Sequence, residues 1–346
     1  MRVLLTGASG LLGRAISARL RGRRDIELSG TAFSRARAPL IKADLTNSAE
    51  VAALFASTKP DFVIHAAAER RPDIVDGNPG QARALNVAAT EMVARACAQS
   101  GAYLLYISTD YVFDGSNPPY FPDSPVNPLN EYGKLKLEGE ARVAAAMAEK
   151  AQGAAADTGS GAAAGSGDGT GAMTRVAAKA AILRIPILYG PVEKLEESPV
   201  TELAALLKKG EPCAVDDWAS RYPLHVDDAA AGIETIMDAA MRRPGGLAAA
   251  PRRGLPVFLL SSPVAFTKYG MIAAIAKALG VDASFVHPDA SPPKGAARLL
   301  GATLLKVAPR PKDCRMDTTA IEALGYKPRI EFEQGIADAL APFFQG

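Results

Sequence analysis

The chain has 346 residues, of which 48% are hydrophobic, so it is long enough to bury the core of one large α/β domain or two smaller ones. Its formal net charge of +2 gives no reason to expect a nucleic acid or an anionic membrane as the main partner. No apolar stretch approaches the roughly 20 residues that a helix needs to span a bilayer.

The three cysteines, Cys97, Cys213 and Cys314, are odd in number and widely spaced. This usage is typical of a reduced cytosolic protein rather than a disulfide scaffold. The first residues lead directly into an apolar run and lack the charged and long apolar regions of a secretory signal. The histidines do not cluster with the cysteines, so no metal site is expected. We therefore expect a cytoplasmic protein.

Short apolar runs at residues 3–5, 62–65, 103–107 and 181–185 predict strands, and helical spacing fills residues 49–56 and 81–100 between them. This alternation predicts an α/β fold, a Rossmann-type doubly wound parallel sheet with a smaller C-terminal substrate-side region. We expect a dinucleotide-binding domain over residues 1–190, with residues 191–346 forming the smaller region, partly interleaved with it. Residues 151–173 hold almost only small and polar side chains and are expected to be a disordered surface insertion.

The first strand runs into a glycine-rich turn, Gly7-Ala8-Ser9-Gly10-Leu11-Leu12-Gly13, which is followed by an amphipathic helix. In such a turn Gly7 lets the chain reverse, Gly10 lets the backbone approach a pyrophosphate, and Gly13 lets helix and strand pack closely. The helix N-terminus then offers free N–H groups to the phosphates. Glycines alone are a weak signal, but the flanking strand and helix favour a dinucleotide site.

The segment after the second expected strand carries Ser34, Arg35 and Arg37 where a site that prefers NAD usually has an acidic residue. Guanidinium groups pair with phosphate oxygens, so these residues suit the 2′-phosphate of NADP. The alternative is an ordinary solvated basic loop. The position of the segment favours NADP as the cofactor.

Further cofactor contacts are expected after the third and fourth strands. Asp44 can accept a hydrogen bond from the adenine amino group, and Leu45 can pack on its ring. The small side chain of Ala66 would let the cofactor lie flat at the edge of the sheet. Arg70 could reach the cofactor or an anionic substrate, and a surface salt bridge is an equal alternative.

A Tyr-x-x-x-Lys pattern places Tyr132 and Lys136 on one face of a helix. The lysine cation would lower the pKa of the phenol and could hold the nicotinamide ribose, and the tyrosine would act as an acid toward a carbonyl. Thr109 leaves the fifth strand at its carboxyl end, where it could orient a carbonyl oxygen. The pattern alone is frequent by chance, but together with the glycine turn it predicts a carbonyl-reducing site.

Taken together, these residues resemble the extended short-chain dehydrogenase/reductase superfamily. Two families within it compete. Residues 108–115, Ser-Thr-Asp-Tyr-Val-Phe-Asp-Gly, are shared by dTDP-4-dehydrorhamnose reductases and by the regulatory beta subunits of methionine adenosyltransferase. Other segments are similar to the beta subunits, namely residues 65–73, 183–190, 192–198, 217–218, 221–223 with 225–226, and 267–269.

The resemblance implies cofactor contacts at residues that match the family by position, which are Ser9, Gly10, Leu11, Leu12, Phe33, Ser34, Arg35, Asp44, Leu45, Ala66, Arg70, Tyr132, Lys136 and Leu188. It implies an NADP-binding regulatory subunit whose partner is the catalytic subunit of methionine adenosyltransferase. The alternative is an NADPH-dependent reductase of a nucleotide-linked keto sugar. The resemblance leaves open whether the chain is an enzyme, because both families keep Thr109, Tyr132 and Lys136.

Beta subunits extend past their last helix with a tail that docks into the catalytic subunit, whereas this sequence ends at residues 342–346. The resemblance therefore implies either that the partner is engaged differently here or that the regulatory role is weakened.

Overall fold

The computed structural model describes residues 1–158, 179–243, 247, 254–292, 297–300, 303–306 and 309–344. Its centre is a seven-stranded sheet in the order β10-β6-β5-β4-β1-β2-β3, and every neighbouring pair is parallel. The strands are β1 (Arg2–Thr6), β2 (Glu27–Ala32), β3 (Ile41–Lys42), β4 (Phe62–His65), β5 (Tyr103–Thr109), β6 (Ala180–Ile185) and β10 (Val257–Leu259). The expected doubly wound parallel sheet is confirmed.

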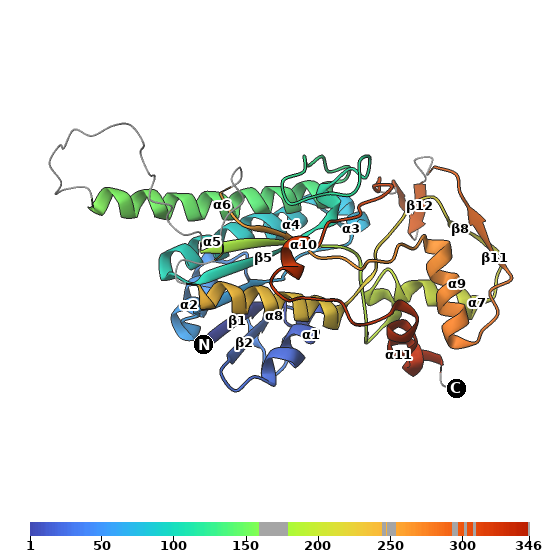
Figure 1. Cartoon of the computed structure of the whole chain (residues 1–346), viewed down its shortest axis with the longest axis horizontal. Helices are drawn as coiled ribbons and strands as arrows, with labels where there is room; N and C mark the ends of the chain where they lie inside the picture. The colour runs from blue at the N-terminus through green and yellow to red at the C-terminus, as the bar shows by residue number, and fades with distance from the viewer. Residues whose placement is uncertain are drawn as a thin grey trace.

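Helices cover both faces of this sheet (Figure 1). One face packs on α1 (Leu11–Arg21) and α8 (Val226–Arg242), and the other packs on α2 (Ser48–Thr58), α5 (Ala89–Ser100) and α6 (Glu131–Thr158). Adjacent residues of β1 alternate between the two cores, with Leu4 in one and Leu5 in the other. A strand buried on both faces is continuously apolar for this reason.

The connection between β4 and α5 contains two short helices, α3 (Pro72–Gly77) and α4 (Pro79–Arg83), and a π-helical turn, η1 (Ala84–Ala88). The expected helix over residues 81–100 is therefore present, with one widened turn inside it. Such turns often lie at functional sites.

Helix α6 continues to Thr158. The expected insertion at residues 151–173 is thus helical over its first eight residues, because the alanines there favour a helix that is already under way. The rest of that expected insertion lies outside the described residues.

A second, smaller unit, which we call the C-terminal lobe, has its own apolar core. Its strands form parallel pairs, β7 (Leu188–Tyr189) with β9 (Leu224–His225) and β8 (Cys213–Asp216) with β11 (Val286–Asp289). Its helices are α7 (Ala204–Lys209), α9 (Lys268–Leu279) and α11 (Phe332–Phe344), with 3-10 turns η3 (Leu195–Glu197) and η4 (Thr201–Leu203). A short antiparallel pair, β12 (Ala297–Leu300) and β13 (Thr303–Lys306), also lies on this side (Figure 1).

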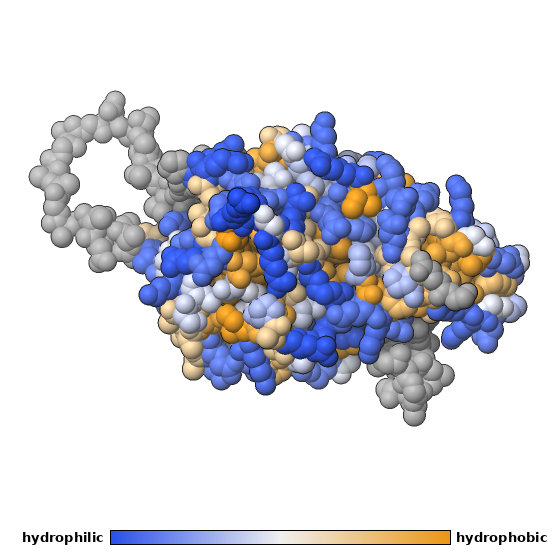
Figure 2. Space-filling view, turned by 90° about the horizontal axis from the view of Figure 1, so that it is seen from below, coloured by the Kyte–Doolittle hydropathy of each residue, from blue (hydrophilic) through white to orange (hydrophobic). Residues whose placement is uncertain are grey.

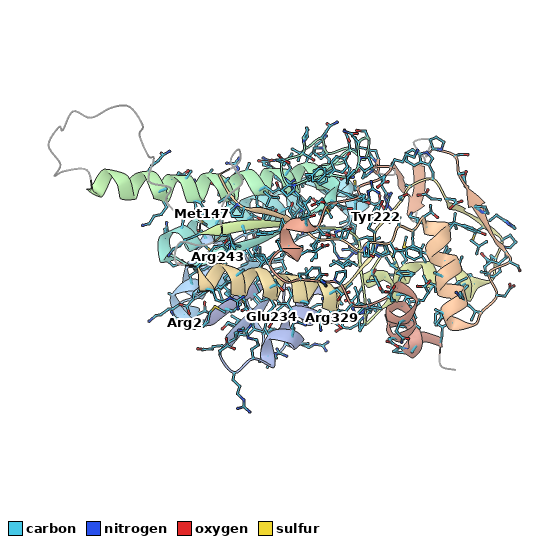
Figure 3. All side chains as sticks on the ribbon, in the orientation of Figure 1. Arg2, Met147, Tyr222, Glu234, Arg243 and Arg329 are labelled. Atoms are coloured by element: carbon cyan, nitrogen blue, oxygen red, sulfur yellow. The ribbon has the colours of Figure 1, made fainter. Side chains whose placement is uncertain are left out.

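Between these lobe elements the chain returns to the sheet. Helix α8 packs along α1, β10 pairs with β6, and α10 (Thr319–Glu322) packs on both α8 and β10. Glu234 of α8 lies toward α1, where it pairs with Arg19 and Arg23 (Figure 3).

The face seen in Figure 2 mixes polar and apolar side chains, and apolar side chains gather near the end formed by the C-terminal lobe. Within the described ranges, no helix is long and apolar enough to cross a membrane.

Candidate functional site

The glycine turn follows β1 and needs glycine at two of its predicted positions. Gly7 has φ +72°, and a Cβ there would lie 2.9 Å from Cα of Ala67. A Cβ on Gly13 would lie 2.2 Å from the carbonyl oxygen of Gly7. The N–H of Gly10 donates to that same oxygen at 3.0 Å, which closes the turn. The turn therefore brings backbone close to backbone, as a dinucleotide site requires.

Helix α1 begins at Leu11 directly after the turn. In the structure as described, no side chain caps its N-terminus at Gly10 and its first turn carries no acidic residue. The first N–H groups of a helix have no partner within the helix and attract anions. The turn and the helix end together fit the pyrophosphate of a dinucleotide. Ser9 and Leu12 beside them are partly exposed, whereas Leu11 is buried in the core.

The segment after β2 places Phe33, Ser34, Arg35 and Arg37 at the surface. Phe33 is 58% exposed, which is unusual for a large hydrophobic residue. Arg35 donates from Nη1 to Oε1 of Glu197 at 2.6 Å. The cation expected to bind the 2′-phosphate thus contacts an acidic side chain from η3.

Arg70 follows β4 and is directed to the same region, where it donates from Nη2 to the main-chain oxygen of Glu197. Its segment is held by Asn86, whose side chain accepts from the N–H of Glu69 and donates to the carbonyl oxygen of Glu69, both at 2.9 Å. Asn86 lies in the π-helical turn and is fully buried. The turn therefore anchors the loop that carries Arg70.

The remaining expected cofactor contacts lie around the same edge of the sheet. The carboxylate of Asp44 accepts from the N–H and the hydroxyl of Thr46, and these bonds lower its pKa. Leu45 is buried in the apolar core beside α2, so its side chain anchors the loop after β3 to that core. Ala66 donates its N–H to Thr6 at 3.2 Å, and Leu188 lies on β7 where its carbonyl oxygen accepts from Ser198.

Thr109 and Tyr132 come together as the sequence predicts. Thr109 ends β5 and Tyr132 lies in the first turn of α6, close enough for the Thr109 hydroxyl to lower the pKa of the Tyr132 phenol. Tyr111 packs edge-on against the Tyr132 ring at 6.2 Å. Thr109 also donates to Oδ1 of Asp110 at 3.0 Å. A carbonyl oxygen placed here could accept from the Tyr132 hydroxyl, and also from Thr109 if the Thr109 proton turned away from Asp110.

The pKa of Tyr132 differs from the expectation. Burial raises it, the hydrogen bond with Thr109 lowers it, the charge of Asp110 raises it and the charge of Arg70 lowers it. The net effect raises the pKa of Tyr132, and the cation that opposes this shift is Arg70. The prediction that the Lys136 cation brings this pKa toward working pH was therefore wrong.

Lys136 lies one turn further along α6 and is buried, with Nζ 4.0 Å from the centre of the Tyr106 ring. Burial lowers its pKa to about 7, and the charge of Glu140 opposes the shift. Glu140 is itself held by Arg184 of β6, at 2.6 and 2.9 Å, and by the hydroxyl of Ser108 at 2.6 Å. This buried group fixes the helix face that carries Tyr132 and Lys136.

Several residues of the site were not identified from the sequence. Asp110 is buried beside Thr109, and burial raises its pKa to about 6 despite the hydrogen bond from Thr109 and the charge of Arg221. Arg14 and Glu197 join α1 to η3, through contacts of 2.7 and 3.2 Å. Arg14 and Glu197 are 183 positions apart in the sequence, so no local pattern could predict that they pair.

Among the residues that the structure describes, no group of three or more histidine, cysteine or acidic side chains could hold a metal ion. His65 bonds to Thr6 and Thr90 inside the core, and burial lowers its pKa to about 3. It is a neutral structural side chain.

The sequence matches one family model over residues 1–151 and 166–344, the RmlD substrate binding domain. Methionine adenosyltransferase 2 subunit beta of Xenopus tropicalis is 37% identical over 343 residues, covering 99% of this chain and 88% of the relative. The same protein of Mus musculus gives the same figures. dTDP-4-dehydrorhamnose reductase of Streptomyces griseus is 29% identical over 347 residues, covering 98% of this chain and 92% of the relative.

Solved structures share the fold. A dTDP-4-dehydrorhamnose reductase of Clostridium acetobutylicum has a TM-score of 0.73 at 24% identity, covering 99% of both chains. The reductase of Bacillus anthracis in complex with NADP scores 0.72 at 21% identity, covering 99% of this chain and 98% of the other. UDP-glucose 4-epimerase of Thermus thermophilus with NAD scores 0.72 at 19% identity, covering 100% and 99%.

Proposed function

The chain belongs to the RmlD substrate binding domain family, and we propose that within this family it is an NADP-binding regulatory subunit of methionine adenosyltransferase. The observation that carries this proposal is the 37% identity to methionine adenosyltransferase 2 beta subunits over 99% of the chain. The reductase of Streptomyces griseus reaches 29% over a similar length. The role would be to modulate S-adenosylmethionine synthesis by a catalytic partner.

NADP fits the residues that are present. The glycine turn and the uncapped start of α1 suit the pyrophosphate, and Arg35 with Arg37 suits the 2′-phosphate. Tyr132 and Lys136 lie where they could hold the nicotinamide ribose. The free cysteines, two of them buried, support work in a reducing compartment such as the cytoplasm.

The decisive experiment uses the purified full chain and the methionine adenosyltransferase of its own organism. We expect the two proteins to co-elute in size-exclusion chromatography and the chain to change the kinetics of the enzyme, with and without NADP. A catalytic subunit that elutes alone and keeps its kinetic constants contradicts the regulatory function.

A second function, reduction of a nucleotide-linked keto sugar, is favoured by one observation: Thr109 lies at the end of β5, near the phenol of Tyr132 at the start of α6. Bound NADPH would supply the hydride. Thr109 would orient the carbonyl oxygen, Tyr132 would donate a proton to it, and Lys136 would hold the ribose. Because the buried phenol has a raised pKa, it is protonated at neutral pH and suited to donate.

This second function predicts that the chain oxidises NADPH in the presence of a dTDP-4-keto-6-deoxy sugar and that Tyr132→Phe abolishes the reaction. NADPH absorbance measures both. Unchanged absorbance with the sugar present excludes this activity without touching the regulatory proposal.

A further inference from the structure

Three arginines from three separate parts of the sheet unit converge on residues 192–198, which enter the C-terminal lobe. Arg14 comes from α1, Arg35 follows β2, and Arg70 follows β4. Arg14 and Arg35 donate to the carboxylate of Glu197, and Arg70 donates to its main-chain oxygen. Arg14 also donates to the main-chain oxygen of Ser9 in the glycine turn. Glu193 pairs more loosely with Arg14 and Arg35, at 4.0 and 3.8 Å, so Glu197 is the main acidic partner of these cations.

The carboxylate of Glu197 is held in this position by burial and by several hydrogen bonds. Its side chain is 13% exposed, and Oε2 also accepts from the N–H of Glu193 at 2.9 Å. Burial alone would raise the pKa of Glu197, but the hydrogen bonds from Arg14, from the N–H of Glu193 and from Arg35 lower it to about 2. Glu197 is therefore an anion at every working pH.

The segment around Glu197 is anchored at both ends. Ser198 donates from its hydroxyl to the carbonyl oxygen of Leu188 at 2.6 Å, and Thr201 donates to that of Leu195 at 2.7 Å. A carboxylate held this way presents charged oxygens to guanidinium groups, as a phosphate monoester does. A 2′-phosphate that paired with Arg35 would meet a like charge at short range.

We propose that Glu197 is a specificity-determining residue for the cofactor, an internal anion that occupies Arg35 and must leave it before a 2′-phosphate can bind. The inference rests on the proposed binding of NADP. NAD lacks the phosphate and has no need of Arg35, so Glu197 disfavours NADP relative to NAD. Binding of NADP then displaces the Glu197 carboxylate from Arg35, whereas binding of NAD leaves this ion pair in place.

The test measures the dissociation constants of NADP and NAD for the full chain by isothermal titration calorimetry. Glu197→Gln keeps the shape of the side chain and removes its charge, and we expect it to tighten NADP binding about tenfold, with NAD binding changed by less than about twofold. Glu196→Gln, an exposed neighbour on the same turn, is the matched control and should leave both constants unchanged.

The same substitution made in an Arg35→Ala chain tests whether Glu197 affects NADP binding through Arg35. In an Arg35→Ala chain, we expect Glu197→Gln to give no selective gain for NADP, because the cation through which the two anions compete is gone. Weaker NADP binding by Glu197→Gln would overturn the inference, because it would show that Glu197 holds Arg35 ready for the phosphate.

Equal NADP binding by wild type and Glu197→Gln would also overturn it. Failure of all these variants and of the wild type to bind NADP would instead overturn the proposed cofactor. Thermal melting of each variant confirms that the chains compared are folded.

Discussion

At the scale of single residues, Asp110 lies buried beside the Thr109 hydroxyl, in an environment that disfavours its charged form. Burial raises its pKa from an ordinary 3.8 to about 6. The folded protein therefore holds a proton between about pH 4 and pH 6 that the unfolded chain releases, so stability falls as the pH rises through this window. Near neutral pH, Asp110 destabilises the fold.

We expect Asp110→Asn to be more stable than the wild type at pH 7, by up to about 3 kcal/mol, which corresponds to a pKa shift of about two units. The asparagine carbonyl can still accept from Thr109. The difference between the two proteins should shrink as the pH falls from about 6 to about 4. Urea unfolding at several pH values measures it, and a difference that does not vary with pH would contradict the assignment.

Gly13 supplies a second prediction at this scale. A Cβ at this position would lie 2.2 Å from the carbonyl oxygen of Gly7, so Gly13→Ala must push α1 away from the turn. We expect a loss of about 1–3 kcal/mol in unfolding free energy and a large loss of NADP affinity.

The matched control is Gly22→Ala at the other end of α1, where the nearest atom to the new Cβ is 3.6 Å away and φ is −71°. This variant should bind NADP as the wild type does. Equal cofactor affinity of the two variants would show that the close approach at Gly13 has no role in binding.

The candidate site residues could be proposed from local patterns, because the glycine turn and the Tyr132–Lys136 spacing lie within single stretches of sequence. Glu197 and Asp110 could not be assigned in the same way. Their roles depend on burial and on partners such as Arg14, which are set only when distant segments fold together. The error about the Tyr132 pKa has the same origin, since the spacing places Lys136 on the correct helix face but says nothing about which cation acts on the phenol.

At the scale of elements, α6 is the helix that presents the site, and a buried charge pair holds it to the sheet. Glu140 of α6 accepts two hydrogen bonds from Arg184 of β6, and both side chains are almost fully buried. Removing one partner of such a pair leaves an uncompensated charge in the core, whereas replacing both by apolar groups is often neutral.

We therefore expect Arg184→Met to lower the unfolding free energy by about 3–5 kcal/mol. The double variant Glu140→Leu with Arg184→Met should recover much of that loss. Urea denaturation of the single and double variants measures the coupling. If the two variants were equally unstable, the pair would contribute through packing alone.

Strands β1, β4, β5 and β6 and helices α2 and α5 could be predicted because their apolar residues recur over several positions. The two exposed residues of β3 and the short α3 carry no such pattern. The π-helical turn could not, since the widened turn depends on Asn86 bonding to the loop after β4 rather than on any local preference. The continuation of α6 to Thr158 was missed because a lack of large side chains was taken to indicate disorder, while alanine is the strongest helix former.

At the scale of the whole molecule, the sheet unit is completed by segments from the second half of the chain. Helix α8 buries residues such as Ile233 and Met237 in the same core as α1, and β10 pairs with β6. The expected boundary at residue 190 is therefore a boundary along the sequence and does not separate two physical cores. The sequence predicts that the two regions are partly interleaved, but it does not indicate which segments return, because strand pairing between distant segments leaves no local trace.

A fragment of residues 1–190 should accordingly fail to fold cooperatively, because the face of α1 and the edge of β6 would lose their cover. We expect it to bind a hydrophobic dye and to unfold without a sharp transition, while the full chain does neither. Circular dichroism and dye fluorescence decide the matter. A sharp melting transition for the fragment would establish residues 1–190 as an autonomous domain.

The repeated passage of the chain between sheet and lobe has a mechanical consequence. The backbone enters the C-terminal lobe after β6, returns at α8, leaves again after β10, and returns once more at α10 before ending in α11. A lobe attached at so many points cannot swing on a single hinge, because every connection would have to bend at once. Relative motion of the two units is then limited to small sliding displacements shared among all the crossings. A displacement of the backbone at the first crossing, beside η3, must therefore be accompanied by small displacements at the other crossings.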